Sequence, residues 1–339
     1  VTFANHVRLW PLRSPVQILS QPLQKIEASP LETSIAFLTQ STSSFSFRSG
    51  VWTPRRDSLI SIPLPVSSSS FPFVIRWNPL GTSFLLAGFS LPIPAYWIRT
   101  DPTPIRLDQL PRGTYHWSNN YILVGSDDVN MTRLQTRSYR LIREQLPPTY
   151  LFLDEDSSLY TTGTPPSLFF TQRSFQERIY QLSRLDWRII DRLEDFVILK
   201  QGSSDKWMAL DTARTPAYAG ETHGDYPRWF KNQNSTQRQR ALLLNKGEAW
   251  LWEPKGLNRL LWRQAEPLRA ILWYPDGENI LMADAHHIWA IELDERNGRS
   301  VTSLAEFEDI QDMTLLRQTL YIAGTHQGKE GLWELPLEE

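Results

Sequence analysis

The sequence predicts an all-β fold, a β-propeller of about eight four-stranded blades. Short apolar segments recur along the 339 residues at a nearly constant interval, and a second apolar segment, usually with tryptophan, follows each about ten residues later. The segments are centred on Phe37, Leu85, Leu123, Tyr160, Ile198, Leu243, Leu281 and Tyr321, in steps of 48, 38, 37, 38, 45, 38 and 40 residues. A period of about 40 residues is that of one propeller blade per repeat.

The strand order within a blade is clearest near the C-terminus. Residues 269–293 contain an apolar strand, the turn Pro275-Asp276-Gly277, a second apolar strand and a third strand centred on Trp289. These turn residues have separate roles, because proline fixes φ, aspartate bonds to the backbone and glycine accepts positive φ. Residues 74–98 and 26–38 repeat the same order, and the other repeats keep two apolar strands and a polar turn.

One large side chain marks the third strand of each repeat. Six of the eight repeats have tryptophan there, and the markers in chain order are Trp52, Trp97, Leu134, Phe169, Trp207, Trp250 with Trp252, Trp289 and Trp333. A flat amphipathic ring packs well between sheets, and its N–H can reach a backbone carbonyl. We therefore expect the tryptophans to wedge between neighbouring blades. An aromatic platform for sugars or peptides is the functional alternative.

The last repeat lacks a fourth strand. Its three strands are expected near residues 310–315, 319–323 and 331–335, where the sequence ends. Because an open sheet edge invites unwanted pairing, we predict that the segment Pro15-Val-Gln-Ile-Leu19 supplies the missing strand and closes the propeller. Seven blades are the alternative, if the worn repeat between residues 186 and 225 is not a blade.

Composition excludes several classes of protein. Apolar residues make up 41% and charged residues 21%, as in a globular domain and unlike a disordered chain. The 35 basic and 37 acidic residues give a net charge of −2, so no overall field favours nucleic acid. The lack of cysteine excludes disulfides, thiolate metal sites and cysteine nucleophiles. No window of 18 apolar residues predicts a membrane span.

Two stretches resemble known families. The repeats are similar to those of TolB-like and WD-like propellers through Pro275-Asp276-Gly277 and the Pro-x-Gly at 79–81, although no repeat has the Gly-His and Trp-Asp pair of a regular WD40 repeat. Residues 1–10, Val-Thr-Phe-Ala-Asn-His-Val-Arg-Leu-Trp, resemble the final strand of a PEGA domain, a β-sandwich module of bacterial surface proteins. This resemblance implies a lead-in over residues 1–12 that ends an upstream PEGA-like domain, and a propeller over residues 13–339.

The segment that we expect to carry binding mixes aromatic and polar side chains. It contains Tyr218, His223, Asp225, Tyr226, Trp229 and Phe230. The expected ligand is a protein or a glycan. The structural alternative for this segment is a long loop followed by the inner strand of the sixth blade.

Other candidate sites are interpreted as structural. His286 and His287 lie in a turn where neighbouring side chains point to opposite sides, so joint metal binding is not expected. The acidic segments at residues 127–130 and 154–158 lack the glycine and distal glutamate of a helical calcium loop, which favours solvated turns. No Gly-x-Ser-x-Gly elbow or glycine-rich phosphate loop occurs. We therefore predict no catalytic residue, no cofactor and no metal.

These observations favour a non-enzymatic propeller that binds or scaffolds other molecules, because rigid blades can present variable loops. The PEGA-like lead-in implies a bacterial protein with the propeller at the cell surface. Since the sequence begins with Val1 rather than Met, we expect its membrane anchor to lie upstream. A cytoplasmic or periplasmic scaffold for protein complexes is the alternative, and a propeller enzyme is the third possibility.

Overall fold

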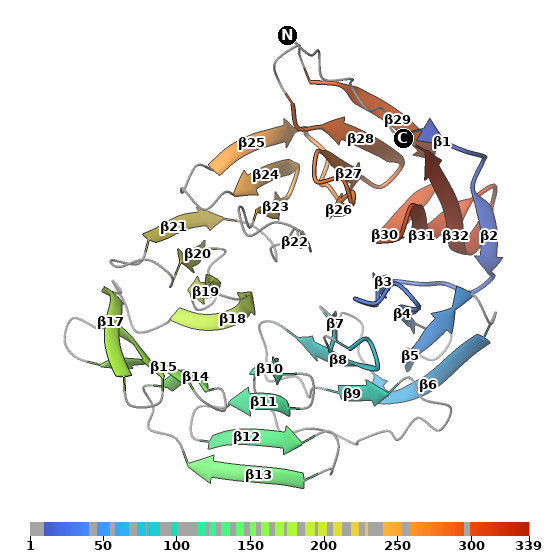
Figure 1. Cartoon of the computed structure of the whole chain (residues 1–339). Coiled ribbons are helices and arrows are strands. Elements are labelled where there is room, and N and C mark those ends of the chain that lie inside the picture. Colours follow the sequence, from blue (N-terminus) through green and yellow to red (C-terminus); the bar gives the residue numbers. More distant parts are fainter. Residues whose placement is uncertain are drawn as a thin grey trace. The chain divides into compact units, whose positions relative to one another are not determined.

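The computed structural model of the chain is built from antiparallel strands (Figure 1). The structure describes residues 10–40, 46–54, 58–67, 73–78, 80–88, 96–99, 114–119, 122–126, 130–135, 140–145, 150–153, 157–162, 167–172, 175–181, 187–193, 196–201, 206–211, 218–223, 228–229, 240–252, 258–294 and 299–338. These ranges contain 32 strands and no α-helix. The prediction of an all-β fold is confirmed.

The chain divides into two compact units, which we describe separately. Unit 1 comprises residues 1–71, 225–254 and 258–339, and unit 2 comprises residues 72–224 and 255–257. Within the described residues each unit contains four antiparallel sheets. Most sheets are formed by strands that follow one another in the chain, which is the order that the repeats predict.

The sheets of unit 2 follow chain order. The first is β7 (Phe73–Trp77), β8 (Ser83–Gly88) and β9 (Tyr96–Arg99), and the second is β10 (Thr114–Asn119), β11 (Ile122–Ser126), β12 (Asn130–Gln135) and β13 (Arg140–Gln145). The third is β14 (Tyr150–Leu153), β15 (Ser157–Thr162), β16 (Ser167–Gln172) and β17 (Phe175–Gln181). The fourth is β18 (Trp187–Leu193), β19 (Phe196–Gln201), β20 (Lys206–Asp211) and β21 (Tyr218–His223).

The sheets of unit 1 come from both ends of the chain. One is β3 (Lys25–Ala28), β4 (Ile35–Gln40), β5 (Ser46–Thr53) and β6 (Ser58–Ser67), and another is β22 (Arg228–Trp229), β23 (Ala241–Asn245), β24 (Glu248–Trp252) and β25 (Asn258–Arg263). A third is β26 (Ala270–Trp273), β27 (Asn279–Ala283), β28 (His287–Glu292) and β29 (Val301–Glu306). The last sheet joins β30 (Asp309–Leu316), β31 (Thr319–His326) and β32 (Lys329–Glu338) to β1 (Trp10–Pro11) and β2 (Val16–Leu19).

The predicted repeat matches the sheets. All eight predicted centres, from Phe37 to Tyr321, lie in the second strand of a sheet, and all the predicted third-strand markers lie in third strands. The worn repeat at residues 186–225 forms a regular four-stranded sheet, β18 to β21.

Three hairpin turns share one hydrogen-bond frame. The backbone N–H groups of Ser29, Asn78 and Tyr274 each donate to the carbonyl five residues later, at 2.8, 2.8 and 3.0 Å. In the first two turns, the side-chain oxygen of Ser29 or Asn78 accepts two further N–H groups. Tyr274 cannot do this, and Asp276 takes the role by accepting the two N–H groups after Gly277, which has a φ of 71°. The predicted Pro-Asp-Gly turn is confirmed.

The predicted N-terminal strand is also confirmed. Val16 and Gln17 of β2 pair with Glu334 and Trp333 of β32, so the N-terminal segment supplies the outer strand of the last sheet. β1 pairs with the end of β32, and therefore residues 10–11 of the predicted lead-in belong to this sheet. Residues 1–9 lie outside the described residues, so the PEGA-like origin of the lead-in stays a prediction.

Buried tryptophans connect neighbouring sheets in unit 1. Trp52 of β5 contacts Tyr321 of β31 edge to face, with ring centroids 5.5 Å apart. Trp333 of β32 lies in a core with residues of β27 and β28, and its Nε1 donates to the Gly324 carbonyl at 3.2 Å. Both tryptophans are 4% exposed. The predicted wedging is confirmed for these two rings, while the side chains of Trp97 and Trp207 lie outside the described residues.

A buried polar ladder joins the last sheet to the first. The backbone N–H of Ile26 in β3 donates to Asp312 Oδ2 at 3.2 Å, and that of Ala28 donates to Thr314 Oγ1 at 2.9 Å. Asp312 and Thr314 are two residues apart in β30, so their side chains lie on the same face of that strand and both reach the edge of β3. Lys25 Nζ lies 3.6 Å from Asp312. We call these five residues the closing seam.

Candidate binding seam

A row of rings lies between the sheet β22–β25 and the sheet β26–β29, both in unit 1. Trp262 of β25 is 5.9 Å from Trp289 of β28 between ring centroids, and Trp289 is 5.5 Å from His287, nearly parallel to it. His287 and Trp289 share one face of β28 because they are two residues apart. All three rings are half-buried. We call these rings, with Asp284 and Gln264, the binding seam.

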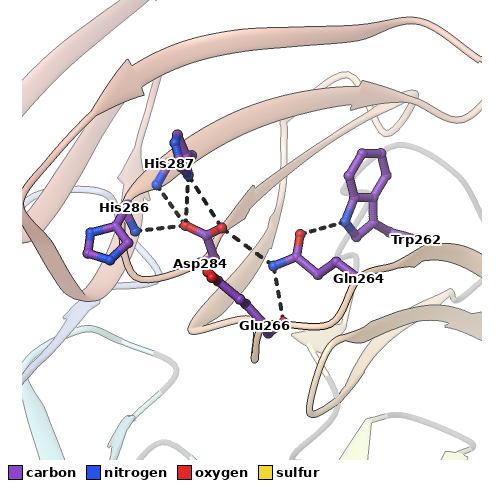
Figure 2. A network of polar contacts seen from close by, with 6 residues as sticks. All are labelled: Trp262, Gln264, Glu266, Asp284, His286 and His287. Atoms are coloured by element: carbon purple, nitrogen blue, oxygen red, sulfur yellow. Dashed lines mark hydrogen bonds and ion pairs between the residues drawn. The ribbon is translucent and has the colours of Figure 1, made fainter.

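Asp284 fixes the turn that carries the histidines. It is 4% exposed, and its Oδ1 accepts the backbone N–H groups of His286 and His287, both at 2.7 Å. Figure 2 shows this carboxylate between the turn and Gln264, whose Nε2 lies 3.5 Å from Oδ2. His287 Nδ1 lies 3.4 Å from Oδ1. The turn β27–β28 is therefore held by a side chain as well as by its strands.

Opposing effects act on the charge of Asp284. Burial raises the pKa of Asp284, but the two backbone N–H donors and the nearby His287 together lower it by more. The pKa therefore lies below its ordinary value. The hydrogen bonds therefore favour the ionised carboxylate. The ionised oxygen is the stronger acceptor for the two N–H groups.

Gln264 links the ring row to the next sheet. Its Oε1 accepts the indole N–H of Trp262 at 2.9 Å, and its Nε2 donates to the Glu266 carbonyl at 3.1 Å (Figure 2). A Cβ on Gly247 would lie 2.2 Å from the Gln264 carbonyl, so this close approach requires glycine. The orientation of Trp262 is thus set by its neighbours.

A second tryptophan is held by an ion pair on the same sheet. Glu248 accepts the indole N–H of Trp250 at 2.9 Å through Oε2, and Arg263 lies 2.8 Å from its Oε1. Arg263 is 64% exposed in its side chain. The charge of this arginine is therefore already balanced within the chain.

The described residues contain no group of three or more His, Asp or Glu side chains that could hold a metal ion. The segments at 127–129 and 154–156 lie outside those residues, so the prediction of solvated turns there stays a prediction. Among the described ranges, no helix has the length and hydropathy needed to cross a bilayer.

The structure separates the residues that the sequence predicted for binding. Tyr218 and His223 are the first and last residues of β21 in unit 2, and Trp229 lies in β22 of unit 1, paired with Ala241. Asp225, Tyr226 and Phe230 lie outside the described residues. The expected long loop is therefore interrupted by two strands, and the binding role of these six residues stays a prediction.

The sequence does not predict the binding seam as one site, although it predicts Trp289 in a third strand and His286 and His287 in the preceding turn. One signal was available, because Trp262 falls in the fourth strand of its repeat, and among the described fourth strands that follow their third strand in the chain only β25 contains tryptophan. The contacts of Asp284 and Gln264 depend on the approach of two sheets, which the sequence does not show.

Comparison with solved structures identifies the fold. The Dos1 propeller is similar with a TM-score of 0.57 at 10% identity, over 97% of this chain and 95% of that chain. Sqt1 of Saccharomyces cerevisiae has a TM-score of 0.56 at 6% identity, over 98% of this chain and 100% of that chain. The β-propeller domain of the Trilobed protease from Pyrococcus furiosus has a TM-score of 0.48 at 9% identity, over 85% and 99% of the two chains.

The chain is therefore a β-propeller. No known family profile matches it, and no curated protein matches it. Identities of 6% and 10% to Sqt1 and the Dos1 propeller show the fold alone. The function must therefore be argued from side chains.

Proposed function

We propose that this propeller is a non-enzymatic binding and scaffolding protein that holds a partner protein at the binding seam. One observation carries the proposal: Trp262, Trp289 and His287 stay half-exposed, although Gln264 fixes Trp262, Asp284 fixes His287, and Trp289 lies against both of these rings. Part of each indole of Trp262 and Trp289 packs against the hydrophobic core of the two sheets. The part that stays exposed is held in a fixed orientation, which is typical of contact surfaces.

Pre-organisation supports this role. A surface whose side chains are already fixed loses little conformational entropy when a partner binds. Here Asp284 fixes the turn and Gln264 fixes Trp262. The seam therefore meets the main structural requirement of a scaffold, a rigid surface of large rings.

Partner capture tests the proposal. The purified chain would be immobilised and exposed to an extract of its source cells, beside the variants Trp262→Leu/Trp289→Leu and Leu59→Ser. Leu59 is 44% exposed on β6 and serves as the control. We expect the wild type and the control to retain the same protein and the double variant to lose it, with all three folded by circular dichroism. Equal retention by all three would contradict the role of the seam.

We further propose that the propeller is presented at a bacterial cell surface by an anchor upstream of residue 1. The support is the PEGA-like pattern of residues 1–10. The test uses the full-length protein in intact cells, with a protease site inserted in a loop and a cytoplasmic protein probed alongside. Cleavage in intact cells, with the cytoplasmic protein uncut, is the expected result. Cleavage only after lysis would favour an internal scaffold.

A further inference from the structure

We infer that the partner segment recognised here is basic and rich in arginine, and that it crosses from the binding seam onto an acidic rim formed by Glu306, Glu308 and Glu330. This inference rests on the proposed function and names the chemistry of the partner. It follows from three features: the ring row, the unpaired carboxylates beside it, and an arginine–tryptophan contact already present between the same two sheets.

The acidic rim is continuous with the binding seam. Glu306 of β29 lies directly opposite His287 of β28 in the strand register, so both side chains are on one face of the sheet. Phe307 follows it, and its N–H donates to the His286 carbonyl at 2.8 Å. The ring of Phe307 contacts His326, with centroids 4.7 Å apart. Phe307 is buried in the core that joins this sheet to the last sheet, so the path from Glu306 to Glu308 runs along the junction of two neighbouring sheets.

Backbone bonds also bring the chain segments that carry the three glutamates next to one another. The N–H of Glu308 donates to the Thr325 carbonyl at 2.9 Å, and Thr325 pairs with Glu330 across β31 and β32. Glu306, Glu308 and Glu330 are all exposed, and none forms an ion pair with a described residue. Lys329 is the exposed basic residue of the same turn. The rim thus presents more negative than positive charge.

The basic residues near the seam do not cancel this charge. Arg263 is paired with Glu248. Lys246 and Arg269 are exposed at the same end of the sheets as Glu306, but they lie beside β23 and β26, whereas Glu306 ends the outer strand β29. The charge that borders the rings at the outer strand is therefore negative, which complements a basic segment.

The chain itself contains a contact of the proposed kind. The guanidinium of Arg240 lies over the ring of Trp273, 5.1 Å from its centroid, and Nη2 donates to the Gly277 carbonyl at 2.7 Å. Arginine suits such sites better than lysine, because its planar group stacks on a ring and still donates hydrogen bonds in the plane. A partner arginine could stack on Trp289 or His287 in this way and bond to Glu306.

Peptide binding tests the inference. The complete chain would be titrated with three ten-residue peptides of glycine and serine that carry four arginines, four lysines or four glutamates, followed by tryptophan fluorescence and calorimetry. We expect the arginine peptide to bind most tightly, the lysine peptide more weakly, and the glutamate peptide not at all. Higher salt should weaken binding, because exposed charges are screened.

Two triple variants of equal charge locate the site. In the rim variant, Glu306, Glu308 and Glu330 are changed to Gln, and in the control variant, the exposed Glu32, Glu278 and Glu338 at the opposite strand ends are changed to Gln. We expect the rim variant to lose roughly tenfold in affinity and the control to stay within about twofold. Trp289→Leu should remove the preference for arginine over lysine.

Three results would overturn the inference. The first is no binding of the arginine peptide, and the second is equal binding of the arginine and glutamate peptides. The third is equal losses in the two triple variants, which would indicate attraction to overall charge alone. The outcomes for the proposed function stay separate. If the double tryptophan variant loses its captured protein but no basic peptide binds, the seam is a binding site for another chemistry. If no protein is captured at the seam, the proposed function itself fails.

Discussion

The closing seam and the binding seam solve the same problem, the joining of two neighbouring sheets, in different ways. In the closing seam the polar side chains are buried: Asp312 is 2% exposed and Thr314 is 3% exposed, and both accept backbone N–H groups of β3. In the binding seam one buried carboxylate, Asp284, organises a turn, and the rings around it remain half-exposed.

The difference separates contacts that stabilise the fold from those of the proposed binding surface. The buried side chains of Asp312 and Thr314 accept backbone N–H groups of β3 that would otherwise have neither water nor protein as a partner. Each of these hydrogen bonds should therefore contribute strongly to the free energy of unfolding. The hydrogen bonds of the binding seam orient Trp262 and the turn that carries His286 and His287. Substitutions in the closing seam should therefore lower the free energy of unfolding, whereas substitutions in the binding seam should mainly change contacts with a ligand.

The largest effect is expected for Asp312→Ala. The substitution leaves the Ile26 N–H without an acceptor and removes the partner of Lys25, and we expect a loss of about 3 kcal/mol in the free energy of unfolding. Urea unfolding measures it. Glu308→Ala, an exposed change just before β30, is the control. A loss below about 1 kcal/mol would mean that the closing seam does not carry stability in this way.

Gly331→Ala should cost about 2 kcal/mol. A Cβ there would lie 2.0 Å from the Leu19 carbonyl, so β2 must move away from β32. Hydrogen exchange should show faster exchange at residues 16–19 than in the wild type. Gly328→Asn is the matched control, since its φ of 69° is one that asparagine tolerates. Unchanged exchange in β2 would contradict the required close approach.

The sequence could predict the strands of both seams but not their contacts. The centre at Tyr321 and the marker Trp333 follow from apolar periodicity, and the N-terminal strand follows from the missing fourth strand of the last repeat. These predictions depend on the local pattern of apolar residues, which identifies strands well. Asp312 and Ile26 are 286 residues apart, and nothing local indicates that their strands lie side by side.

The binding residues illustrate the same limit. The mixture of aromatic and polar residues predicts a binding segment with Tyr218, His223, Asp225, Tyr226, Trp229 and Phe230. The structure assigns Tyr218 and His223 to one edge strand and Trp229 to another sheet, and the binding role stays a prediction. The binding seam depends on Gln264 meeting Trp262 and Asp284 between two sheets. Composition within one segment cannot reveal such a meeting.

The binding seam should set a limit to stability in acid. Because the pKa of Asp284 is lower in the folded protein than its ordinary value of 3.8, the ionised carboxylate stabilises the fold above that pH. This contribution is lost as the pH falls from 3.8 through the lower folded value. Asp284→Asn should cost about 1 kcal/mol at pH 7, and the gap to the wild type should narrow below pH 3.8. Urea midpoints between pH 7 and 3 measure it, and a constant gap would contradict the assignment.

The smallest effect on stability is expected for Glu248→Gln. Its partner Arg263 is 64% exposed, and exposed ion pairs contribute about 0.2–1 kcal/mol because water and salt screen them. The glutamine oxygen can still accept the indole N–H of Trp250, so the ring should keep its place and its fluorescence maximum. Removal of that acceptor by Glu248→Leu should shift the fluorescence of Trp250 with little further change in the urea midpoint. A large loss of stability in either variant would show that this exposed ion pair within one sheet contributes as much to folding as the buried contacts of the closing seam.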